Sequence, residues 1–361
     1  MNNALSLHIA AVRRLGGTAF LLFGCALMSA AADTTRVTVM TRNMDAGTDF
    51  GFVFGAATLP ALMQGAQATL AEIDASRIPE RAAGIAAEIA AHRPDLVALQ
   101  EVTQYWTRTP DGAPVLRYDQ LQALLDALAA RNLSYSPVVV NPLMMAEAPL
   151  TPDLLFGTMD RDVILVRAGI ATAQPQAHRF SDGATFTLPT PLGDVPLWQG
   201  WSSVDITVAG KTFRFVNTHL QSAFKGVPPT LAAQVAQAGE LVQALNATYL
   251  PVVLCGDFNA NADPGEEHYP TTDMVLAAGF TDAWRATNAD KGNTWPLHQE
   301  DPFLPMAGPY ERIDLIFARG PIVVGTERSD APARRQPGSG LGVPGLWPSD
   351  HAGVIAVLEP L

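Results

Sequence analysis

Several apolar, β-prone runs in this chain end in polar residues. The runs cover residues 36–43, 96–101, 213–219 and 252–257, and residues 313–317 and 353–357 form two shorter ones. Runs of this length that are rich in Val, Leu, Ile and Phe are typical of buried strands. A buried strand carries its last side chain to the edge of a sheet. The residues expected at such ends are Asn43, Glu101, His219 and Asp257.

Amphipathic helix patterns separate these runs. Apolar residues recur at helical spacing in residues 79–92, 120–131 and 230–245. Pro79 suits the first turn of the first helix, and Asp119 can cap the second. Strands that alternate with helices in both halves of the chain favour an α/β fold, with sheet layers packed inside helices.

The mature chain is expected to form one domain, residues 33–361. Proline and glycine accumulate in residues 181–200 and 332–348, which are expected to be long surface loops of that domain rather than linkers. Residues 50–76 are apolar and rich in alanine, but Pro60 and scattered glutamines argue against a membrane helix. We expect packed helical turns over a sheet edge there; a substrate lid or a flap that touches lipid is the functional alternative.

The beginning of the chain has the pattern of a secretory signal peptide. Arg13 and Arg14 precede a short apolar stretch, and small residues follow it before Asp33. We therefore expect residues 1–32 to be cleaved and the protein to be exported, to the periplasm or the medium. The alternative is a lipoprotein anchored through Cys25, whose flanking residues match a lipoprotein box only weakly.

The charge of the chain bears on its partners. The formal net charge is −12, and cleavage of residues 1–32, which hold two arginines and no acids, would change it to −14. Proteins that hold long nucleic acids without sequence preference usually present a basic surface, because neutralisation of phosphates supplies most of their affinity. The acidic balance weakens a general nuclease hypothesis without excluding it. After cleavage Cys255 would be the only cysteine, and its apolar neighbours are typical of a packing residue.

The polar residues at the strand ends are mainly oxygen donors. Glu101, Asn43 and several aspartates offer carboxylate or amide oxygens, and the sequence has no clustered Cys/His set of the zinc type. Such donors suit Mg²⁺, or Mn²⁺ as an alternative, better than zinc. Hydrolysis of a phosphate ester needs a hard cation, a positioned water and donors for the charge that develops on the phosphoryl oxygens. The strand ends can supply these parts.

Five short segments resemble, in order, the signature segments of the endonuclease/exonuclease/phosphatase superfamily. They are Pro94-Asp-Leu-Val-Ala-Leu-Gln-Glu101, Asn217-Thr-His-Leu220, Gly256-Asp-Phe-Asn259, Arg312-Ile-Asp314 and Ser349-Asp-His351. One such segment alone is weak support, but five in this order span nearly the whole mature chain. The resemblance implies a DNase I-like fold, a four-layer αββα sandwich in which two mixed sheets are flanked by helices.

The resemblance also implies a metal site. Glu101 would ligate the metal, and Asn43 beside it would bind metal or phosphate through its amide group. Asp350 is a candidate second metal ligand. Asp45 matches an accessory metal position in some relatives, and a turn or cap role is an equal alternative.

Catalytic roles follow from the same resemblance. Asp257 would orient or deprotonate the attacking water, and Asn259 would position water and phosphate. His219 would donate a hydrogen bond to a phosphoryl oxygen. His351 would stabilise the transition state or transfer a proton, with Asp314 holding its tautomer.

Other residues keep two interpretations. Asp160 and Asp162 stand where relatives often carry substrate-site or histidine-orienting residues, but a charged turn before the buried run 163–167 explains them equally simply. Three tryptophans could stack on a substrate or merely pack: Trp198, Trp201 and Trp295.

Motif and fold together predict a reaction type, hydrolysis of a phosphodiester or phosphomonoester outside the cytoplasm. The substrate alternatives are a nucleic acid, a lipid phosphodiester of the sphingomyelin kind and a small phosphate ester. An alternative of another class is a non-catalytic binding protein that kept the fold. We expect no obligate protein partner and a monomer.

Overall fold

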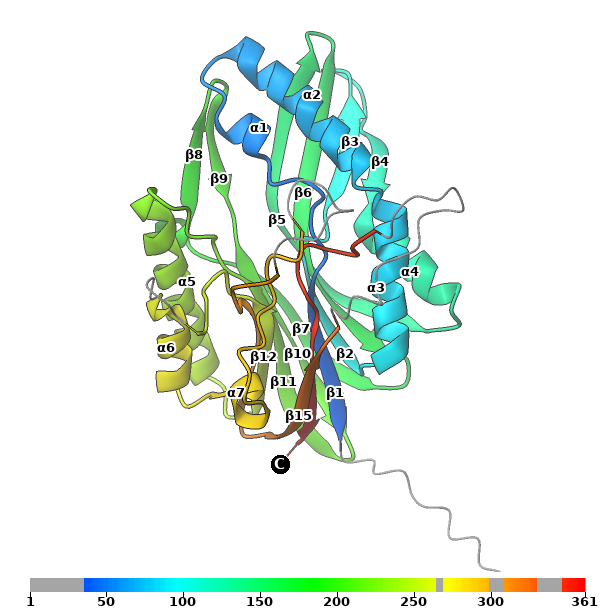
Figure 1. Cartoon of the computed structure of the whole chain (residues 1–361), viewed down its shortest axis with the longest axis vertical. Coiled ribbons are helices and arrows are strands. Elements are labelled where there is room, and N and C mark those ends of the chain that lie inside the picture. Colours follow the sequence, from blue (N-terminus) through cyan, green and yellow to red (C-terminus); the bar gives the residue numbers. More distant parts are fainter. Residues whose placement is uncertain (1–35, 264–268, 299–307, 330–345, 361) are drawn as a thin grey trace, which may run out of the picture. The chain divides into compact units, whose positions relative to one another are not determined.

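The computed structural model describes residues 36–263, 269–298, 308–329 and 346–360, and these form a mixed α/β domain (Figure 1). The expected signal peptide, residues 1–32 with Cys25, lies outside the described residues, as does most of the expected loop 332–348. No helix among the described residues is long and apolar enough to cross a membrane.

The first sheet has eight strands in the order β15-β16-β1-β2-β6-β3-β4, with β5 paired to β6. Its strands are β1 (Val37–Asn43), β2 (Leu96–Gln100), β3 (Gln104–Arg108), β4 (Val115–Asp119), β5 (Tyr135–Thr151), β6 (Leu154–Arg167), β15 (Ile322–Arg328) and β16 (Val354–Glu359). β1 and β2 are parallel, and Asn43 pairs in register with Gln100. Glu101 is therefore the first residue beyond this pair of strands.

The second sheet has six strands in the order β13-β14-β12-β11-β10-β7. They are β7 (Ala171–Arg179), β10 (Gly200–Val208), β11 (Lys211–His219), β12 (Val252–Asp257), β13 (Thr281–Asp282) and β14 (Asp314–Arg319). β11 and β12 run parallel with His219 opposite Asp257, and β12 and β14 run antiparallel with Asp257 opposite Asp314. Three predicted site residues thus lie side by side on neighbouring strands.

Helices cover the outer faces of both sheets, and Figure 1 shows α3 (Ile78–His92) and α4 (Gln120–Ala129) on one side, with α5 (Pro228–Asn246) and α6 (Pro270–Ala277) on the other. Alternate strand residues explain this layering, because successive side chains point to opposite faces of a sheet. In β11, Phe213 and Phe215 join the core between the sheets, whereas Val216 packs in the cluster under α5. The predicted αββα sandwich is confirmed.

The three expected helices are present: α4 begins at the expected residue, and α3 and α5 begin one and two residues earlier than expected. Asp119 caps α4, since its carboxylate accepts hydrogen bonds from the backbone N–H groups of Leu121 and Gln122. Residues 50–76 form two helices, α1 (Gly51–Phe54) and α2 (Leu59–Ala75), and α2 packs along β5. The expected helical turns over the sheet edge are therefore present.

One expected loop is partly regular structure. Residues 181–200 contain a 3₁₀ turn, Asp182–Ala184, and a hairpin of β8 (Phe186–Thr190) and β9 (Gly193–Leu197). The loop prediction was wrong here because prolines are tolerated in a two-stranded ribbon, where half of the N–H groups face solvent. A two-residue turn joins Thr190 to Gly193, whose φ of 116° is accessible to glycine.

Candidate active site

The carboxyl ends of β1 and β2 in one sheet and of β12 in the other meet at one edge of the sandwich. The amide nitrogen of Asn43 donates to Glu101 Oε1 at 2.9 Å and to Asp257 Oδ2 at 3.0 Å. One buried side chain thus joins residues that are 58 and 214 positions away in sequence. Packing between the sheets leaves these strand ends at the same level, so the predicted residues converge.

Two site residues adopt a left-handed backbone conformation. Glu101 has φ 55° and Asn259 has φ 48°, which is uncommon for residues with a side chain. Glu101 Oε2 accepts from the N–H of Ala46 at 2.8 Å, and Asp257 Oδ1 accepts from the N–H of Asn259 at 2.8 Å. Unusual conformations of this kind concentrate at functional sites, where surrounding contacts hold them.

Close contact between β11 and β12 depends on Gly256. A Cβ atom at this position would lie 2.0 Å from the carbonyl oxygen of Thr218. Any side chain there would force the two strands apart and displace His219 from Asp257. The present spacing leaves His219 Nε2 3.8 Å from Asp257 Oδ2 and 3.1 Å from the amide nitrogen of Asn259.

His351 and Asp314 form a buried pair. His351 Nδ1 lies 2.8 Å from Asp314 Oδ2, and Nε2 lies 3.8 Å from Asp257 Oδ2 and 3.8 Å from Asp350 Oδ1. Burial by itself disfavours the imidazolium ion, but the carboxylates of Asp314, Asp350 and Asp257 outweigh it and raise the pKa of His351 well above its usual value. These carboxylates therefore favour the protonated ring, with Nδ1 beside Asp314 and Nε2 facing Asp257 and Asp350.

Asp257 stands between the two halves of this arrangement. Burial raises the pKa of its carboxyl group to about 6, and the neighbouring Asp314 acts in the same direction against the nearby histidines. A carboxylate with a pKa close to neutrality can accept a proton more readily than an ordinary aspartate can. This suits a group that orients or deprotonates water.

The donor set fits a divalent cation. Glu101, His219 and Asp257 offer ligand atoms that all lie within 4.8 Å of one another, and so do Asp257, Asp314 and His351. Asp314 Oδ1 is buried and has no hydrogen-bond partner among the described residues. Carboxylate oxygens in this number favour a hard ion.

The other two predicted metal ligands, Asn43 and Asp350, are not members of these two groups. Asn43 Oδ1 accepts from the N–H of Asp45 at 2.8 Å, while its nitrogen bridges the carboxylates. Asp350 belongs to neither ligand group, and its Oδ2 accepts from Trp295 Nε1 at 3.0 Å. Asp350 thus lies on the His351 side of the site.

Asp45 is tied to cationic and polar partners. Its Oδ2 lies 3.5 Å from Arg81 Nη1 and 3.5 Å from His298 Nε2, and its Oδ1 accepts from the N–H of Gly47. Burial opposes ionisation, but these partners prevail and lower the pKa of Asp45 below its usual range. The geometry favours the turn interpretation, because the carboxylate is already occupied.

Sequence reasoning missed two buried arginines that connect the site segments. Arg42 donates to the carbonyl oxygens of Asn43 and His351. Arg81 donates to the carbonyl oxygens of Met44 and Asp45, and to that of Pro348 at 3.2 Å. Together they hold the segment after β1 against the segment before β16.

A signal for both arginines was present in the sequence. Arg42 interrupts an apolar run, and Arg81 lies four positions before Ile85 on the apolar face of its helix. A charged residue on a buried face needs a partner, and Arg42 has one in Glu88, with Nε 3.0 Å from Oε2. The sequence does not reveal that their remaining donors reach backbone about 300 residues away.

We expect Arg42→Ala to lower the free energy of unfolding by about 3 to 5 kcal/mol, because the buried Glu88 would lose the guanidinium that lies 3.0 Å from its carboxylate. Urea denaturation would measure this. The control is Arg36→Ala, which removes the half-exposed pair with Glu359 and should cost less than about 1 kcal/mol. Equal losses in both variants would contradict the assignment.

Asp160 and Asp162 lie within β6, not in a turn before it. The charged-turn interpretation was wrong because the hairpin with β5 extends pairing along the whole of β6. Asp160 accepts from Thr103 Oγ1 at 3.1 Å, whereas neither carboxyl oxygen of the buried Asp162 has a partner among the described residues. Burial, with Asp160 and Glu101 nearby, raises the pKa of Asp162 well above its usual value.

We expect Asp162→Asn to stabilise the protein in EDTA at neutral pH by about 1 kcal/mol or more, because ionisation of the unpaired carboxyl favours the unfolded chain. Because the pKa of Asp162 is raised in the folded state, the extra stability of Asp162→Asn is absent below about pH 4, where the carboxyl group is protonated in both the folded and the unfolded chain. The extra stability grows as the pH rises above this value. Asp119→Asn is the opposite control. Asp119 accepts a hydrogen bond from Arg161, which lowers the pKa of Asp119 although partial burial opposes this. Asp119→Asn should therefore destabilise the folded protein at neutral pH. Thermal unfolding at pH 3.5 and 7.5 distinguishes the two.

Of the three tryptophans, one lies at the site. The ring centroid of Trp295 is 6.3 Å from that of His351, and its indole nitrogen holds Asp350. Trp198 and Trp201 instead contact side chains of β7. Of these three tryptophans, Trp295 is the one that contacts predicted site residues.

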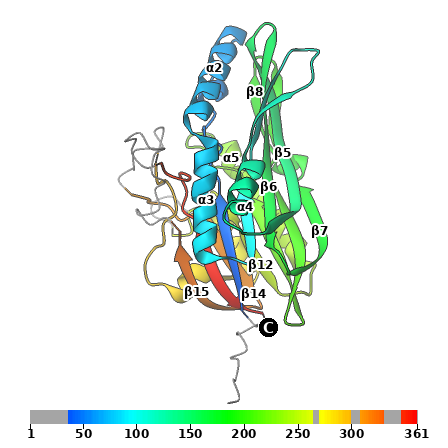
Figure 2. The same cartoon turned by 90° about the vertical axis from the view of Figure 1, so that its right-hand side faces the viewer.

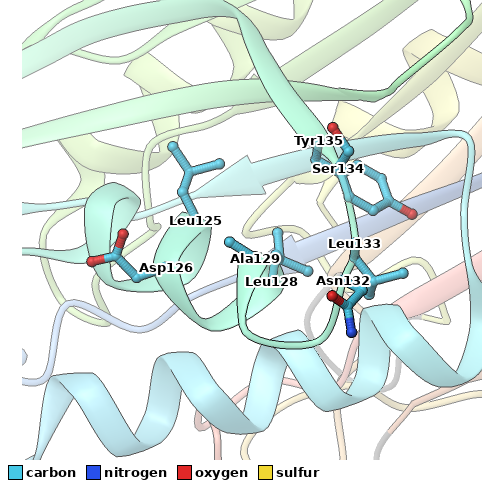
Figure 3. Close-up of a pocket in the computed structure, with 8 residues that line it drawn as sticks. All are labelled: Leu125, Asp126, Leu128, Ala129, Asn132, Leu133, Ser134 and Tyr135. Atoms are coloured by element: carbon cyan, nitrogen blue, oxygen red, sulfur yellow. The ribbon is translucent and has the colours of Figure 1, made fainter.

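A separate hollow of about 600 Å³ lies at the end of α4 and is lined by residues of that helix and the start of β5 (Figure 3). Leucines and Tyr135 dominate its lining, and Asp126 is its only carboxylate. It contains none of the predicted site residues. The converging strand ends are therefore the stronger candidate site.

Comparisons with known proteins agree with this geometry. The family model described as "Endonuclease/Exonuclease/phosphatase family" matches residues 61–351. No curated protein matches significantly. Among solved structures, an endonuclease/exonuclease/phosphatase from Beutenbergia cavernae is 22% identical with a TM-score of 0.54, over 90% of this chain and 72% of that one.

Two further structures extend the likeness. A functionally unknown conserved protein from Enterococcus faecalis is 16% identical with a TM-score of 0.53, over 90% of this chain and 100% of that one. A humanized D. rerio TDP2 is 15% identical with a TM-score of 0.51, over 90% and 99%. At these identities the similarity concerns the fold.

Proposed function

Because the chain belongs to the endonuclease/exonuclease/phosphatase family, we propose that it is a magnesium-dependent phosphodiesterase in which water attacks a phosphate that a Mg²⁺ ion held by Glu101 would bind. The observation that carries the proposal is the position of Asp257. Its carboxylate accepts from Asn43, which also holds Glu101, and lies 3.8 Å from Nε2 of both His219 and His351. A water and a phosphate at this point would meet every group that the reaction needs.

Each side chain has a task that follows from its contacts. Asp257 accepts the proton of the attacking water, since burial has raised its pKa towards neutrality. Asn259, held by its hydrogen bond to the carbonyl oxygen of Leu220 at 2.9 Å, positions the water and phosphate. His219 donates to a phosphoryl oxygen.

His351 stabilises the charge of the transition state. Asp314 accepts from Nδ1–H and favours the protonated ring, so that Nε2 can also carry a proton and donate toward the site. Glu101 would hold the Mg²⁺ ion, which when bound supplies positive charge to the phosphoryl oxygens and activates the water. Mn²⁺ should substitute for it because both accept oxygen ligands.

The test is product release by the purified protein from a chromogenic phosphodiester, DNA, sphingomyelin and a phosphomonoester. We expect cleavage of a diester with Mg²⁺ or Mn²⁺ and a loss of at least about 10³-fold in EDTA, restored by added Mg²⁺. Activity that EDTA leaves unchanged would reject the metal mechanism. If the folded protein released no product from any of these substrates, a binding protein that kept the fold would be the better interpretation.

We also propose that the protein is exported as a monomer after removal of residues 1–32. The apolar stretch and small residues of that segment support export. Mass spectrometry of the protein from producing cells tests it. A mature N-terminus close to Asp33 is expected, whereas a lipid-modified Cys25 would select the anchored alternative.

A further inference from the structure

The helix α1 and the beginning of α2 present apolar side chains to solvent. Phe52 is 55% exposed and Leu59 is 45% exposed, and α1 has no buried residue. Exposed large side chains are ordinary when scattered. Here they belong to one segment in which every residue from 51 to 61 is exposed or only partly buried.

This exposure is built into the fold. Phe50 and Val53 pack on the cluster under α2, so the inner side of α1 is already used. Gly65 of α2 allows α1 to approach so closely that a Cβ there would lie 2.1 Å from the carbonyl oxygen of Phe52. Phe52 is thus directed outward by a close helix contact, and α1 cannot turn it inward without losing that contact.

The segment is also uncharged. Residues 50–71 contain no Asp, Glu, Lys or Arg, and residues 43–76 contain no Lys or Arg. The nearby cations Arg77 and Arg117 form ion pairs with Glu80 and Asp74. A segment that has no lysine or arginine of its own is a poor match for nucleic acid or anionic lipid, which basic residues attract. It suits a neutral apolar partner.

The segment lies at the active-site end. Figure 1 places α1, the beginning of α2 and the turn between β8 and β9 at the end of the domain toward which β1 runs, and Figure 2 shows α2 and β8 at that same end. Leu192 in that turn is 58% exposed. The chain between the site and α1 is anchored, because Ala46 donates its N–H to Glu101 and accepts from the hydroxyl of Tyr105.

We propose that Phe52 and Leu59 insert into the surface of a neutral phospholipid layer and so present the active site to a phosphodiester of the lipid head group. As a statement about substrate class this rests on the proposed function, but docking itself does not require hydrolysis. An uncharged, outward-directed apolar segment at the same end of the domain as the site provides the insertion. The charge of −12 predicts a preference for zwitterionic over anionic lipid.

The experiment is sedimentation of the purified protein with phosphatidylcholine vesicles in EDTA, which separates binding from catalysis. We expect Phe52→Ser/Leu59→Ser to weaken binding about 100-fold, from roughly tenfold for each side chain. The matched control is Ile322→Ser/Val324→Ser, since these residues of β15 are 52% and 40% exposed and β15 lies at the opposite end (Figures 1 and 2). Circular dichroism checks that all variants fold, and a soluble diester measures their activity away from lipid.

Several outcomes decide the matter. Loss of vesicle binding in the first variant alone, with cleavage of the soluble diester retained, supports docking. Vesicle binding without cleavage of any ester keeps docking and rejects the proposed function. Equal binding by all variants, no binding by the unmodified protein, or salt-sensitive preference for phosphatidylglycerol overturns docking on neutral lipid. A dimer that only Phe52→Ser/Leu59→Ser dissociates would assign the surface to a second copy.

Discussion

Replacing His351 with alanine is expected to lower turnover by roughly 10³-fold or more while the protein stays folded. The substitution removes the imidazole ring, whose Nε2 lies 3.8 Å from Asp257 Oδ2. In the protonated form, which the neighbouring carboxylates favour by raising the pKa of His351, this ring is the cationic donor on this side of the site. Steady-state kinetics on a soluble diester measures the effect, and it should fall on kcat rather than KM. A transition-state interaction changes kcat, whereas uniform binding changes KM.

Two variants make this result interpretable. His351→Gln can still bond Asp314 with its side-chain amide, so it separates loss of the cation from loss of packing, and it should remain nearly as inactive as the alanine variant. His92→Ala removes a histidine that pairs with Glu327 at the end of α3 and should retain full activity. Turnover by His351→Ala close to that of the unmodified protein would remove His351 from the mechanism.

The second large effect is expected for Glu101→Ala, which should raise the Mg²⁺ concentration for half-maximal activity by about 100-fold or more. Glu101 supplies two carboxylate oxygens beside Asp257, and the left-handed backbone at this residue aims them into the site. Loss of the carboxylate would remove the residue of the group Glu101, His219 and Asp257 to which the proposed function assigns the metal. Titration of activity with Mg²⁺, together with calorimetric measurement of binding, gives the shift.

The outcome depends on where the change appears. Lower activity that high Mg²⁺ partly restores would support ligation, whereas an unchanged Mg²⁺ midpoint with low turnover would assign Glu101 a role toward substrate. Glu80→Ala is a suitable comparison, because Glu80 is a surface residue paired with Arg77 and should leave the midpoint unaltered.

Local sequence patterns alone determined where several strands and one helix of this protein lie. The strands at 37–43, 96–100, 211–219 and 252–257 end at or beside the polar residues that mark the runs, because an apolar β-prone stretch must be buried and its polar end must leave the core. Asp119 caps α4 for an equally local reason. The resemblance that five motifs in this order carry to a known family then implied the αββα sandwich.

Tertiary structure alone decided the features that depend on distant contacts. The left-handed turn at Glu101 is maintained by Ala46 and Asn43, and the backbone of His351 is held by Arg42 across 309 positions. Pairing along the whole β5–β6 hairpin made Asp162 a buried strand residue rather than part of a turn. Local patterns specify which side chains are buried and where an element ends, but partners far apart in sequence are chosen only when the layers pack, since that packing sets the distances between them.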